Sequence, residues 1–472
     1  MYQSFIGLEI HIHLAAETKA FCGCKAHFGD EENTNVCPVC MGFPGVLPTL
    51  NEKAIQMAYT VGRALNCKLS RNTMFERKNY FYPDMPKNYQ ISQFAEPVGT
   101  DGYIDLEIGD SVKRVRIHDV HFEEDAGKMI HAGDMSLLDY NRAGYPLLEV
   151  VTEPDLVVGE DAEAFLRSFR RMVRYLGVCD GNMEEGSMRC DANVSINPEG
   201  KGLGTKVEIK NLNSSRFVRK GLNYEIERQS ALMDRGEEIF QETRLWNQNR
   251  DVTEIMRRKE GANDYRYFPE PDLPPFRPSD EFMQAVEESL CELPFARKQR
   301  LMTGLGLTSE QAEYIHDEKY TADFFEQAVF LGAGAVPIYS WLSSDVKKLL
   351  NRKNMTLEES PLTPERMAAL ISMIDEGQIS GKIAKTVLDL IFEEDKDPGV
   401  ITSEKGLVQI SDRSSVEAFV DQVLEIHGPV AEAVRSGDAR QMGFLMGQVM
   451  KVSGGKAAPR VVQTVLKEKV LG

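Results

Sequence analysis

Residues 8–14 read Leu-Glu-Ile-His-Ile-His-Leu and form the most informative strand of the expected fold. Side chains alternate between the two faces of a strand, so the four aliphatic residues lie on one face. Glu9, His11 and His13 then lie on the opposite face, at intervals of about 7 Å. One apolar and one polar face is typical of an antiparallel sheet that is buried on one side.

Two later segments repeat this pattern. Residues 187–196 place Met188 and every second residue after it on an apolar face. Their polar face carries Ser187, Arg189, Asp191, Asn193 and Ser195. Residues 205–210 place Val207 and Ile209 on the apolar face and Lys206, Glu208 and Lys210 on the polar face. The mixture of His, Arg, Asp, Asn and Glu favours a site that binds a metal or phosphate. An ordinary solvated sheet face is the alternative.

The first 280 residues contain short alternating runs separated by turn signals. Residues 103–108 and 112–117 predict a hairpin around Gly109-Asp110. An acidic segment, 121–128, follows, and residues 146–155 predict a strand that carries Glu149 and Glu153. Helices are expected at 54–64 and 162–176. These signals predict an α+β fold in which an antiparallel-sheet cradle is flanked by helices.

From about residue 281 the apolar residues recur with a helical period. Thr308 and Gln311 resemble a capping box, and Thr363-Pro364-Glu365 predicts the start of a helix that ends before Gly377. Further helices are expected at 382–394, 415–427, 441–451 and 459–470. The second half is therefore predicted to form two all-helical modules. The expected domains are 1–292, 293–405 and 406–472.

The chain of 472 residues has a net charge of −18, which argues against a protein that coats nucleic acid electrostatically. Residues 431–472 nevertheless carry seven Lys/Arg and three acids, a local charge of +4. This tail is either an RNA-binding surface or ordinary solvated surface. The uncharged run 327–344 contains two glycines and a proline, so a core segment is a better interpretation than a membrane span. No secretory signal is recognised, and a soluble, cytoplasmic protein is expected.

Four of the eight cysteines form two close pairs, Cys22/Cys24 and Cys37/Cys40. Two pairs of thiolates separated by a loop can complete a tetrahedral Zn²⁺ site. Buried or redox-paired thiols are the alternative. We predict a structural zinc knuckle at residues 22–40, because four protein ligands leave no open position for catalysis.

Several long and unusual strings give the chain a resemblance to the B subunit of the tRNA-dependent amidotransferases, the GatB family. The similarity covers nearly the whole length, and residues 327–472 are similar to stand-alone YqeY-type helical proteins. The strings are Gly7–His11, Gly42–Pro48, Arg77–Asp84, Tyr89–Gln93, Glu123–Lys128, Met183–Asn193, Glu208–Ser214 and Asp264–Asp272.

The resemblance implies an enzyme that corrects misacylated tRNA, either Glu on glutamine tRNA, Asp on asparagine tRNA, or both. ATP phosphorylates the side-chain carboxylate, and ammonia then displaces the phosphate. The ammonia comes from glutamine hydrolysed on a partner amidase, the A subunit, and a small C subunit completes a heterotrimer. No phosphate-binding Gly-x4-Gly-Lys-Ser/Thr loop and no recognisable glutaminase nucleophile is found, so ammonia would arrive from elsewhere.

Phosphoryl transfer requires Mg²⁺ held by hard ligands and cations around the phosphates. The predicted catalytic residues are Glu9, His11, Lys78, Glu123, Glu124 and Glu149, with His11, Glu124 and Glu149 as Mg²⁺ ligands and Glu123 as a close alternative to Glu124. ATP or substrate is expected to contact Lys87, Lys128, Ser187, Arg189, Asp191, Asn193, Lys206, Glu208, Lys210, Asn211 and Asn213. Hairpin salt bridges are the alternative role for each lysine. In the tail, Lys451, Lys456 and Arg460 are the predicted tRNA contacts.

Two rival functions are a non-catalytic, zinc-stabilised tRNA-binding scaffold and a zinc hydrolase. The acids Glu9, Glu123, Glu124 and Glu149 count against the scaffold, because they would repel RNA unless a cation lies between them. The four thiolates count against the hydrolase, because they leave the metal no vacant position.

Overall fold

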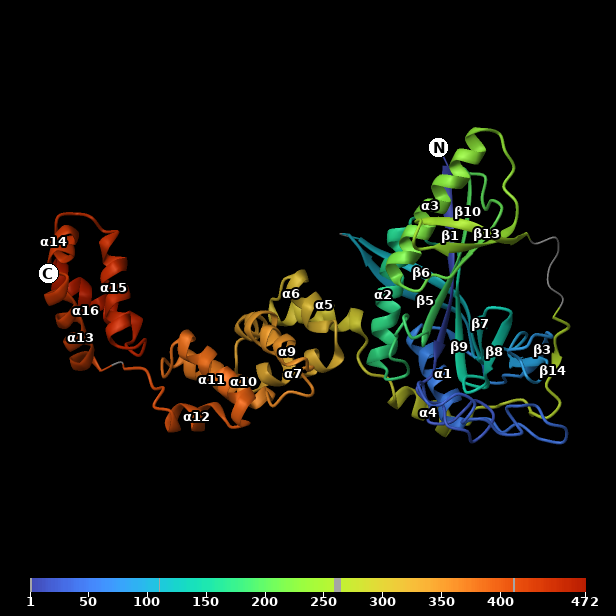
Figure 1. Ribbon diagram of the computed structural model, residues 1–472, viewed down its shortest axis with the longest axis horizontal. Helices are drawn as coiled ribbons and strands as arrows, with labels where there is room; N and C mark the ends of the chain where they lie inside the picture. The colour runs from blue at the N-terminus through green and yellow to red at the C-terminus, as the bar shows by residue number, and fades with distance from the viewer. Residues whose placement is uncertain (1, 110, 259–264, 411) are drawn as a thin grey trace. The chain divides into compact units, whose positions relative to one another are not determined.

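The computed structural model describes residues 2–109, 111–258, 265–410 and 412–472 (Figure 1). The chain divides into two compact units, Met1–Arg297 and Lys298–Gly472. The α+β prediction is confirmed: strands and four helices form the first unit, and the second unit is helical. The three-part division at residues 292 and 405 stays a prediction. Asp110 of the predicted hairpin turn and Asp264 of the family string lie outside the described residues.

A nine-stranded sheet with the order β13-β12-β11-β10-β1-β9-β6-β5-β2 organises the first unit. Two small sheets, β14-β3-β4 and β7-β8, accompany it. The strands are β1 Tyr2–His13, β2 Lys68–Leu69, β3 Glu76–Asn79, β4 Tyr89–Ser92, β5 Gly99–Ile108, β6 Ser111–Glu124, β7 Lys128–Ala132, β8 Met135–Asp139, β9 Pro146–Thr152, β10 Met188–Pro198, β11 Val207–Lys210, β12 Glu242–Asn247, β13 Val252–Arg258 and β14 Phe268–Pro269.

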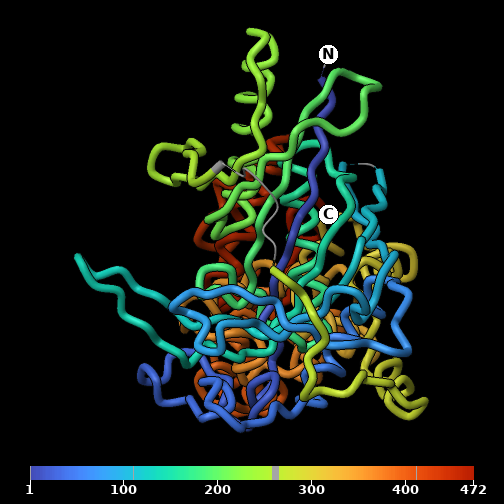
Figure 2. The backbone as a smooth tube through the Cα atoms, turned by 90° about the vertical axis from the view of Figure 1, so that its right-hand side faces the viewer, coloured from blue at the N-terminus to red at the C-terminus, as the bar shows by residue number. Residues whose placement is uncertain are grey.

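Strand β1 occupies the centre of the large sheet, between β9 and β10, and the blue N-terminal strand can be followed beside β10 in Figure 2. Its aliphatic residues Leu8, Ile10 and Ile12 are buried, as the alternation predicts. Helices α1 (Glu52–Ala64), α2 (Gly159–Tyr175) and α3 (Ser215–Asp234) contribute to the same hydrophobic core. The polar face of β1 therefore lies opposite this core.

The sheet is antiparallel except for the pair β11 and β12, which is parallel. Helix α3 connects these two strands, as a parallel connection requires a crossover. Ser214 caps α3 by accepting a hydrogen bond from the Phe217 N–H. The sequence interpretation did not identify this helix.

The two helix starts that were predicted from capping residues are confirmed. Thr308 and Gln311 form a capping box at α6, and Thr363 caps α10 with Pro364 in its first turn. The remaining helices are α4 Asp280–Glu288, α5 Pro294–Leu305, α6 Ser309–His316, α7 Lys319–Phe330, α8 Ala335–Trp341, η1 Leu342–Val346, α9 Lys347–Lys353, α10 Pro364–Asp375, α11 Gly381–Glu394, α12 Pro398–Glu404, α13 Arg413–Ile426, α14 Gly428–Arg435, α15 Gln441–Val452 and α16 Pro459–Leu471.

The second unit contains two separate hydrophobic clusters. One extends from Leu301 to Ile401, and the other from Val416 to Val470. The uncharged run 327–344 contributes Ile338 and Leu342 to the first cluster, as a core segment should. Among the described residues, every helix is too short or too polar to cross a bilayer.

Candidate active site

Four neighbouring strands place a row of polar side chains on the open face of the large sheet. In the order β10, β1, β9 and β6, the row is formed by Arg189, His11, Glu149 and His121, which are direct cross-strand partners. His11 Nε2 lies 3.3 Å from Glu149 Oε2, and His121 Nε2 lies 3.0 Å from the same oxygen. One carboxylate oxygen is therefore shared by two imidazoles.

Two more carboxylates complete this cluster. Glu9 Oε1 and Glu123 Oε1 lie 3.9 and 4.0 Å from His11 Nε2. Glu9, His11 and Glu149 each offer a ligand atom within 4.8 Å of the others, and His121, Glu123 and Glu149 do the same. Both sets combine carboxylate oxygens with imidazole nitrogen and fit a divalent cation.

His121 was missed by the sequence interpretation, although a signal for it existed. It stands two residues before Glu123 on β6, so strand alternation places both side chains on the same face. The Asp119 carboxylate fixes the ring of His121 through a contact of 3.0 Å to its Nδ1.

The imidazoles and carboxylates of this row shift one another's pKa values. Burial by itself would raise the pKa of Glu149, but His121 and His11 outweigh it and hold that pKa well below its usual range. Burial by itself would lower the pKa of His11 and His121, but the Glu149 carboxylate outweighs it and raises both. Without a metal ion, the row therefore favours a Glu149 carboxylate between two protonated rings, and a ring must lose a proton before its nitrogen can ligate a cation.

Glu9 behaves differently. Burial, followed by repulsion from Glu149, raises the pKa of Glu9 to about 7. Glu9 thus changes its charge near neutral pH. Glu9 and Glu149 therefore have pKa values shifted in opposite directions, and such pairs of acids are common at functional sites.

The row opens into a cavity of about 850 Å³. Lys78 extends into it from β3, and the Tyr265 ring lies 5.2 Å from its ammonium. Burial would lower the pKa of Lys78, but Glu123 raises it and keeps the ammonium charged. The lining residues are Glu9, His11, Lys78, Tyr80, Gln90, Glu123, Asp125, Ala126, Leu147, Arg189, Asp191, Glu208, Lys210, Gln241, Arg257 and Tyr265.

Arg189 and Lys210 are the predicted phosphate-binding cations that line this cavity. Arg189 donates to Asp125 over 2.8 Å, and Lys210 forms ion pairs with Asp191 and Glu208. The Nε of Arg189 is buried and has no hydrogen-bond partner among the described residues. A buried guanidinium nitrogen without a partner is unfavourable unless a ligand supplies an acceptor.

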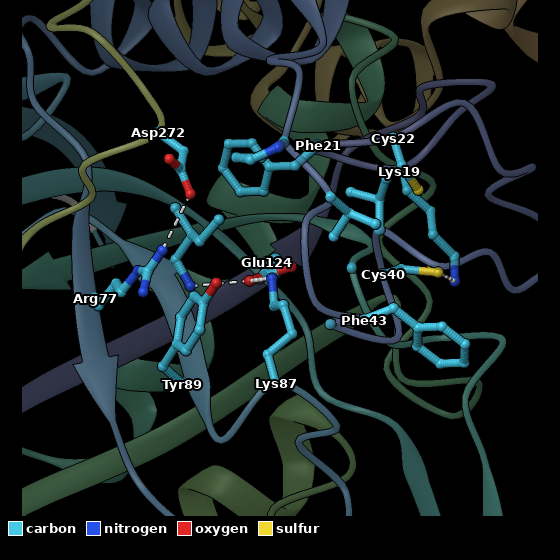
Figure 3. Close-up of a pocket in the computed structure, with 16 residues that line it drawn as sticks. Lys19, Phe21, Cys22, Cys40, Phe43, Arg77, Lys87, Tyr89, Glu124 and Asp272 are labelled. Carbon is cyan, nitrogen blue, oxygen red and sulfur yellow. Dashed lines mark hydrogen bonds and ion pairs between the residues drawn. The ribbon is translucent and has the colours of Figure 1, made fainter.

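Glu124 does not join His11 and Glu149, so the predicted trio of ligands is not assembled. Glu124 follows Glu123 on β6 and therefore points to the opposite face. There it forms a buried ion pair with Lys87 and accepts a hydrogen bond of 2.9 Å from the Ile91 N–H (Figure 3). Both residues line a separate cavity of about 170 Å³, and Glu123 takes the predicted place beside His11.

Several predicted substrate residues lie outside the lining of the large cavity. Ser187 donates to Asp180 and to the Asn182 carbonyl within a tight loop. Asn211 donates to the Trp246 carbonyl, and Asn213 donates to Asn211. Three further predicted substrate residues do not line this cavity. They are the half-buried Asn193 on β10 and two exposed lysines, Lys128 on β7 and Lys206 before β11.

His13 supports the site from its edge. Its Nε2 lies 2.6 Å from Asp125 Oδ2, the oxygen that also accepts from Arg189. Burial would raise the pKa of Asp125, but Arg189 and the His13 contact lower it well below its usual range. Asp125 therefore stays ionised and orients Arg189.

The four predicted zinc ligands are brought together. The sulfurs of Cys22, Cys24, Cys37 and Cys40 lie within 4.8 Å of one another, and Cys37 Sγ is 3.9 Å from Cys40 Sγ. Tetrahedral ligands at the usual Zn–S distance are about 3.8 Å apart. A hydrogen bond between Cys22 and Cys40 lowers the pKa of the Cys40 thiol and raises the pKa of the Cys22 thiol well above its usual range, so Cys40 ionises first. The donor set therefore fits Zn²⁺.

The predicted tRNA contacts gather around one turn of the tail. Lys451 lies in the last turn of α15 and Arg460 lies in the first turn of α16, and both are exposed. Gly454 and Gly455 between them have positive φ angles of 63° and 80°. Lys456 is half-buried and donates to the Gly406 carbonyl over 2.9 Å, so it also stabilises the turn.

Comparisons with known proteins identify the family of this chain. A family described as the GatB/GatE catalytic domain matches residues 4–284, and one described as the GatB domain matches 323–470. A protein of Persephonella marina is 47% identical over 469 residues, which cover 99% of each chain. Proteins of Carboxydothermus hydrogenoformans and Geobacter sulfurreducens are 45% and 46% identical, with at least 99% of each chain covered. All three are named as the B subunit of an aspartyl/glutamyl-tRNA(Asn/Gln) amidotransferase, and the chain belongs to this GatB family.

Proposed function

We propose that this chain is the B subunit of a tRNA-dependent amidotransferase and carries its ATP-dependent amidation step. The substrate would be Glu-tRNA(Gln), Asp-tRNA(Asn) or both, as the names of the relatives suggest. The main support is the row of Arg189, His11, Glu149 and His121, which places possible metal ligands beside a cation that can bind phosphate. Arg189 and His11 of this row line the large cavity together with Glu9 and Glu123.

The chemistry explains why such a cavity is needed. Ammonia does not attack a free carboxylate, because the anion is stabilised by resonance and its oxygen leaves poorly. Transfer of a phosphoryl group from ATP supplies the leaving group. The negative charge of the phosphates must then be neutralised by cations held in fixed positions.

The residues of the cavity can be given separate roles. Glu9, His11 and Glu149 would hold Mg²⁺, directly or through water, with Glu123 and His121 beside them. Bound Mg²⁺ would neutralise charge on the transferred phosphoryl group. Arg189 would offer its buried Nε to an anionic oxygen of ATP or of the acceptor carboxylate. Lys78 and Lys210 would contribute further positive charge.

The scaffold alternative is not favoured by this geometry. A sheet face that only holds RNA phosphates should be lined by cations. The cavity also contains five carboxylates beside its cations, namely Glu9, Glu123, Asp125, Asp191 and Glu208. These carboxylates suit a metal-dependent reaction better than simple RNA binding.

ATP hydrolysis tests the function directly. The chain, purified with its partner subunits, is expected to hydrolyse ATP in a Mg²⁺-dependent manner and to form Gln-tRNA or Asn-tRNA when misacylated tRNA and ammonia are supplied. Product is measured as the amidated aminoacyl group, and correctly acylated tRNA serves as the control. Absence of ATP hydrolysis in the presence of misacylated tRNA would exclude the proposal.

The partners belong to the same proposal. We expect an amidase A subunit and a small C subunit to co-purify with this chain in the cytoplasm, where aminoacyl-tRNA is used. The Zn²⁺ of the cysteine cluster would be structural, because four thiolates leave no open coordination position.

The tail makes a separate prediction about tRNA affinity. Deletion of residues 406–472 is expected to raise the KM for misacylated tRNA, because Lys451, Lys456 and Arg460 would no longer contact its phosphates. Such contacts increase affinity and salt dependence but read little sequence, so recognition of the tRNA would depend on its shape. The partner's glutamine hydrolysis without tRNA should change little. Steady-state kinetics at several salt concentrations measure both effects.

Point variants separate charge from folding in this tail. Lys451→Ala/Lys456→Ala/Arg460→Ala should raise the KM more mildly and flatten its salt dependence. Lys451→Ala/Arg460→Ala leaves the Lys456 contact with Gly406 intact, and Lys467→Ala on α16 is the matched control. An unchanged KM in the deletion variant would assign the basic tail to ordinary surface.

A further inference from the structure

Lys19 is a completely buried lysine beside the cysteine cluster. Its side chain has a relative exposure of 0%, and it lines the smaller cavity together with Cys22 and Cys40 (Figure 3). A buried ammonium is strongly unfavourable unless an anion and hydrogen-bond acceptors surround it. An anion that balances the charge of Lys19 must therefore lie among its neighbours.

The contacts of Lys19 identify one candidate. Its Nζ lies 3.7 Å from Cys40 Sγ and 3.2 Å from the Tyr140 carbonyl oxygen. Among the described residues, no carboxylate forms an ion pair with Lys19. Glu124, a carboxylate of the same cavity, is already paired with Lys87. The Tyr140 carbonyl is neutral, so the sulfur cluster is the one source of negative charge in contact with Lys19.

The surrounding backbone fixes this contact. The Lys19 N–H donates to the Cys24 carbonyl, and the Ala20 N–H donates to the Gly144 carbonyl. Gly144 has a φ of +86°, and a Cβ added there would lie 3.4 Å from Lys19 Cδ and 3.5 Å from Cys40 Cβ. The Cys37 N–H also donates to Cys40 Sγ over 3.2 Å. The Cys40 sulfur thus receives the Lys19 ammonium and a backbone N–H from a closely packed wall, in addition to its contact with Cys22.

We propose that Lys19 is the counter-ion of the zinc–thiolate cluster and slows release of the metal. This inference rests on the zinc site proposed above. Four thiolates around Zn²⁺ leave a net charge of −2, and a buried ammonium against one sulfur reduces it to −1. The ammonium also occupies a lone pair of the Cys40 sulfur, so protonation and dissociation of that ligand become harder. Lys19 is a positioning residue and does not itself bind the metal.

Zinc release from the full chain tests the proposal. Lys19→Met fills nearly the same volume without charge. It is expected to release zinc to a chromogenic chelator at least tenfold faster than the wild type. Lys25→Met is the matched control, because Lys25 lies in the same loop but is exposed and paired with Asp30. Its release rate should stay within twofold of the wild type.

The outcomes distinguish this inference from the zinc site itself. A wild-type chain without stoichiometric zinc would overturn both. One zinc per chain with an unchanged release rate in Lys19→Met would overturn only the role of Lys19. Should Lys19→Met not fold, amine labelling of the wild type provides the same test. Lys19 should be protected in the zinc-loaded chain and become reactive after chelation, and equal protection in both states would contradict the proposal.

Discussion

Glu149→Gln is expected to slow amidation of misacylated tRNA by roughly a hundredfold or more, since several kcal/mol of transition-state stabilisation depend on a metal-ligand carboxylate. Glu149 is the central member of the row and accepts from both His11 and His121. A neutral amide offers one hard oxygen but no negative charge to Mg²⁺ or to the two rings. The measurement is Gln-tRNA formation with ATP, Mg²⁺ and free ammonia.

Glu153→Gln is the matched control for this experiment. Glu153 follows the end of the same strand, β9, and belongs to none of the groups of possible metal ligands among the described residues. The same change of charge there should leave the rate within a fewfold of the wild type. Glutamine hydrolysis by the partner without tRNA should be retained in both variants. Near-normal turnover of Glu149→Gln would show that the site has been assigned wrongly.

The variant Glu124→Gln tests a residue of the smaller cavity, apart from the metal ligands of the polar row. This variant is also expected to reduce turnover, although Glu124 is not one of the clustered metal ligands. The reason is that the buried Lys87 ammonium would lose its anion. The free energy of unfolding should therefore fall in Glu124→Gln.

Cys37→Ser/Cys40→Ser is expected to abolish zinc binding, whereas the wild type should contain one Zn²⁺ per chain. The sulfurs of Cys37 and Cys40 are 3.9 Å apart, and residues 22–40 contain no helix and no named strand that could hold them in place without a metal. Metal binding then contributes directly to folding of this loop. Elemental analysis gives the zinc content, and limited proteolysis reports whether the loop at 22–40 has become accessible.

Cys291→Ser serves as the control for this variant. Its thiol lies near the Tyr175 carbonyl, away from the four clustered cysteines, so full zinc content is expected. Substoichiometric zinc in the wild type, or full zinc in the double variant, would exclude the site.

Strand alternation allowed much of the sheet and its polar face to be predicted. It correctly placed Glu9 and His11 opposite Leu8 and Ile10, and Arg189 and Asp191 opposite Cys190. Alternation alone cannot show which strands become neighbours. The row depends on β1 lying between β9 and β10, and long-range register of this kind is not visible in local sequence.

The errors have equally local causes. Glu123 and Glu124 are adjacent, so a shift of one residue decides which of them faces His11. Lys128 belongs to a string shared with the family, but it lies on an exposed hairpin. Lys206 lies beside another such string, but it comes just before a short strand. Helix α3 was missed because its buried face, although helically spaced, includes the glycine Gly221 and the polar residues Glu225 and Gln229.

The central place of β1 has a consequence for synthesis of the chain. Its two neighbours begin only at Pro146 and Met188, so β1 is synthesised well before the strands that it pairs with. At ordinary translation rates this delay is on the order of ten seconds or more. During that time Leu8, Ile10 and Ile12 belong to an unpaired apolar strand, which is prone to aggregation. We therefore expect newly made β1 to depend on chaperones until β10 has been made.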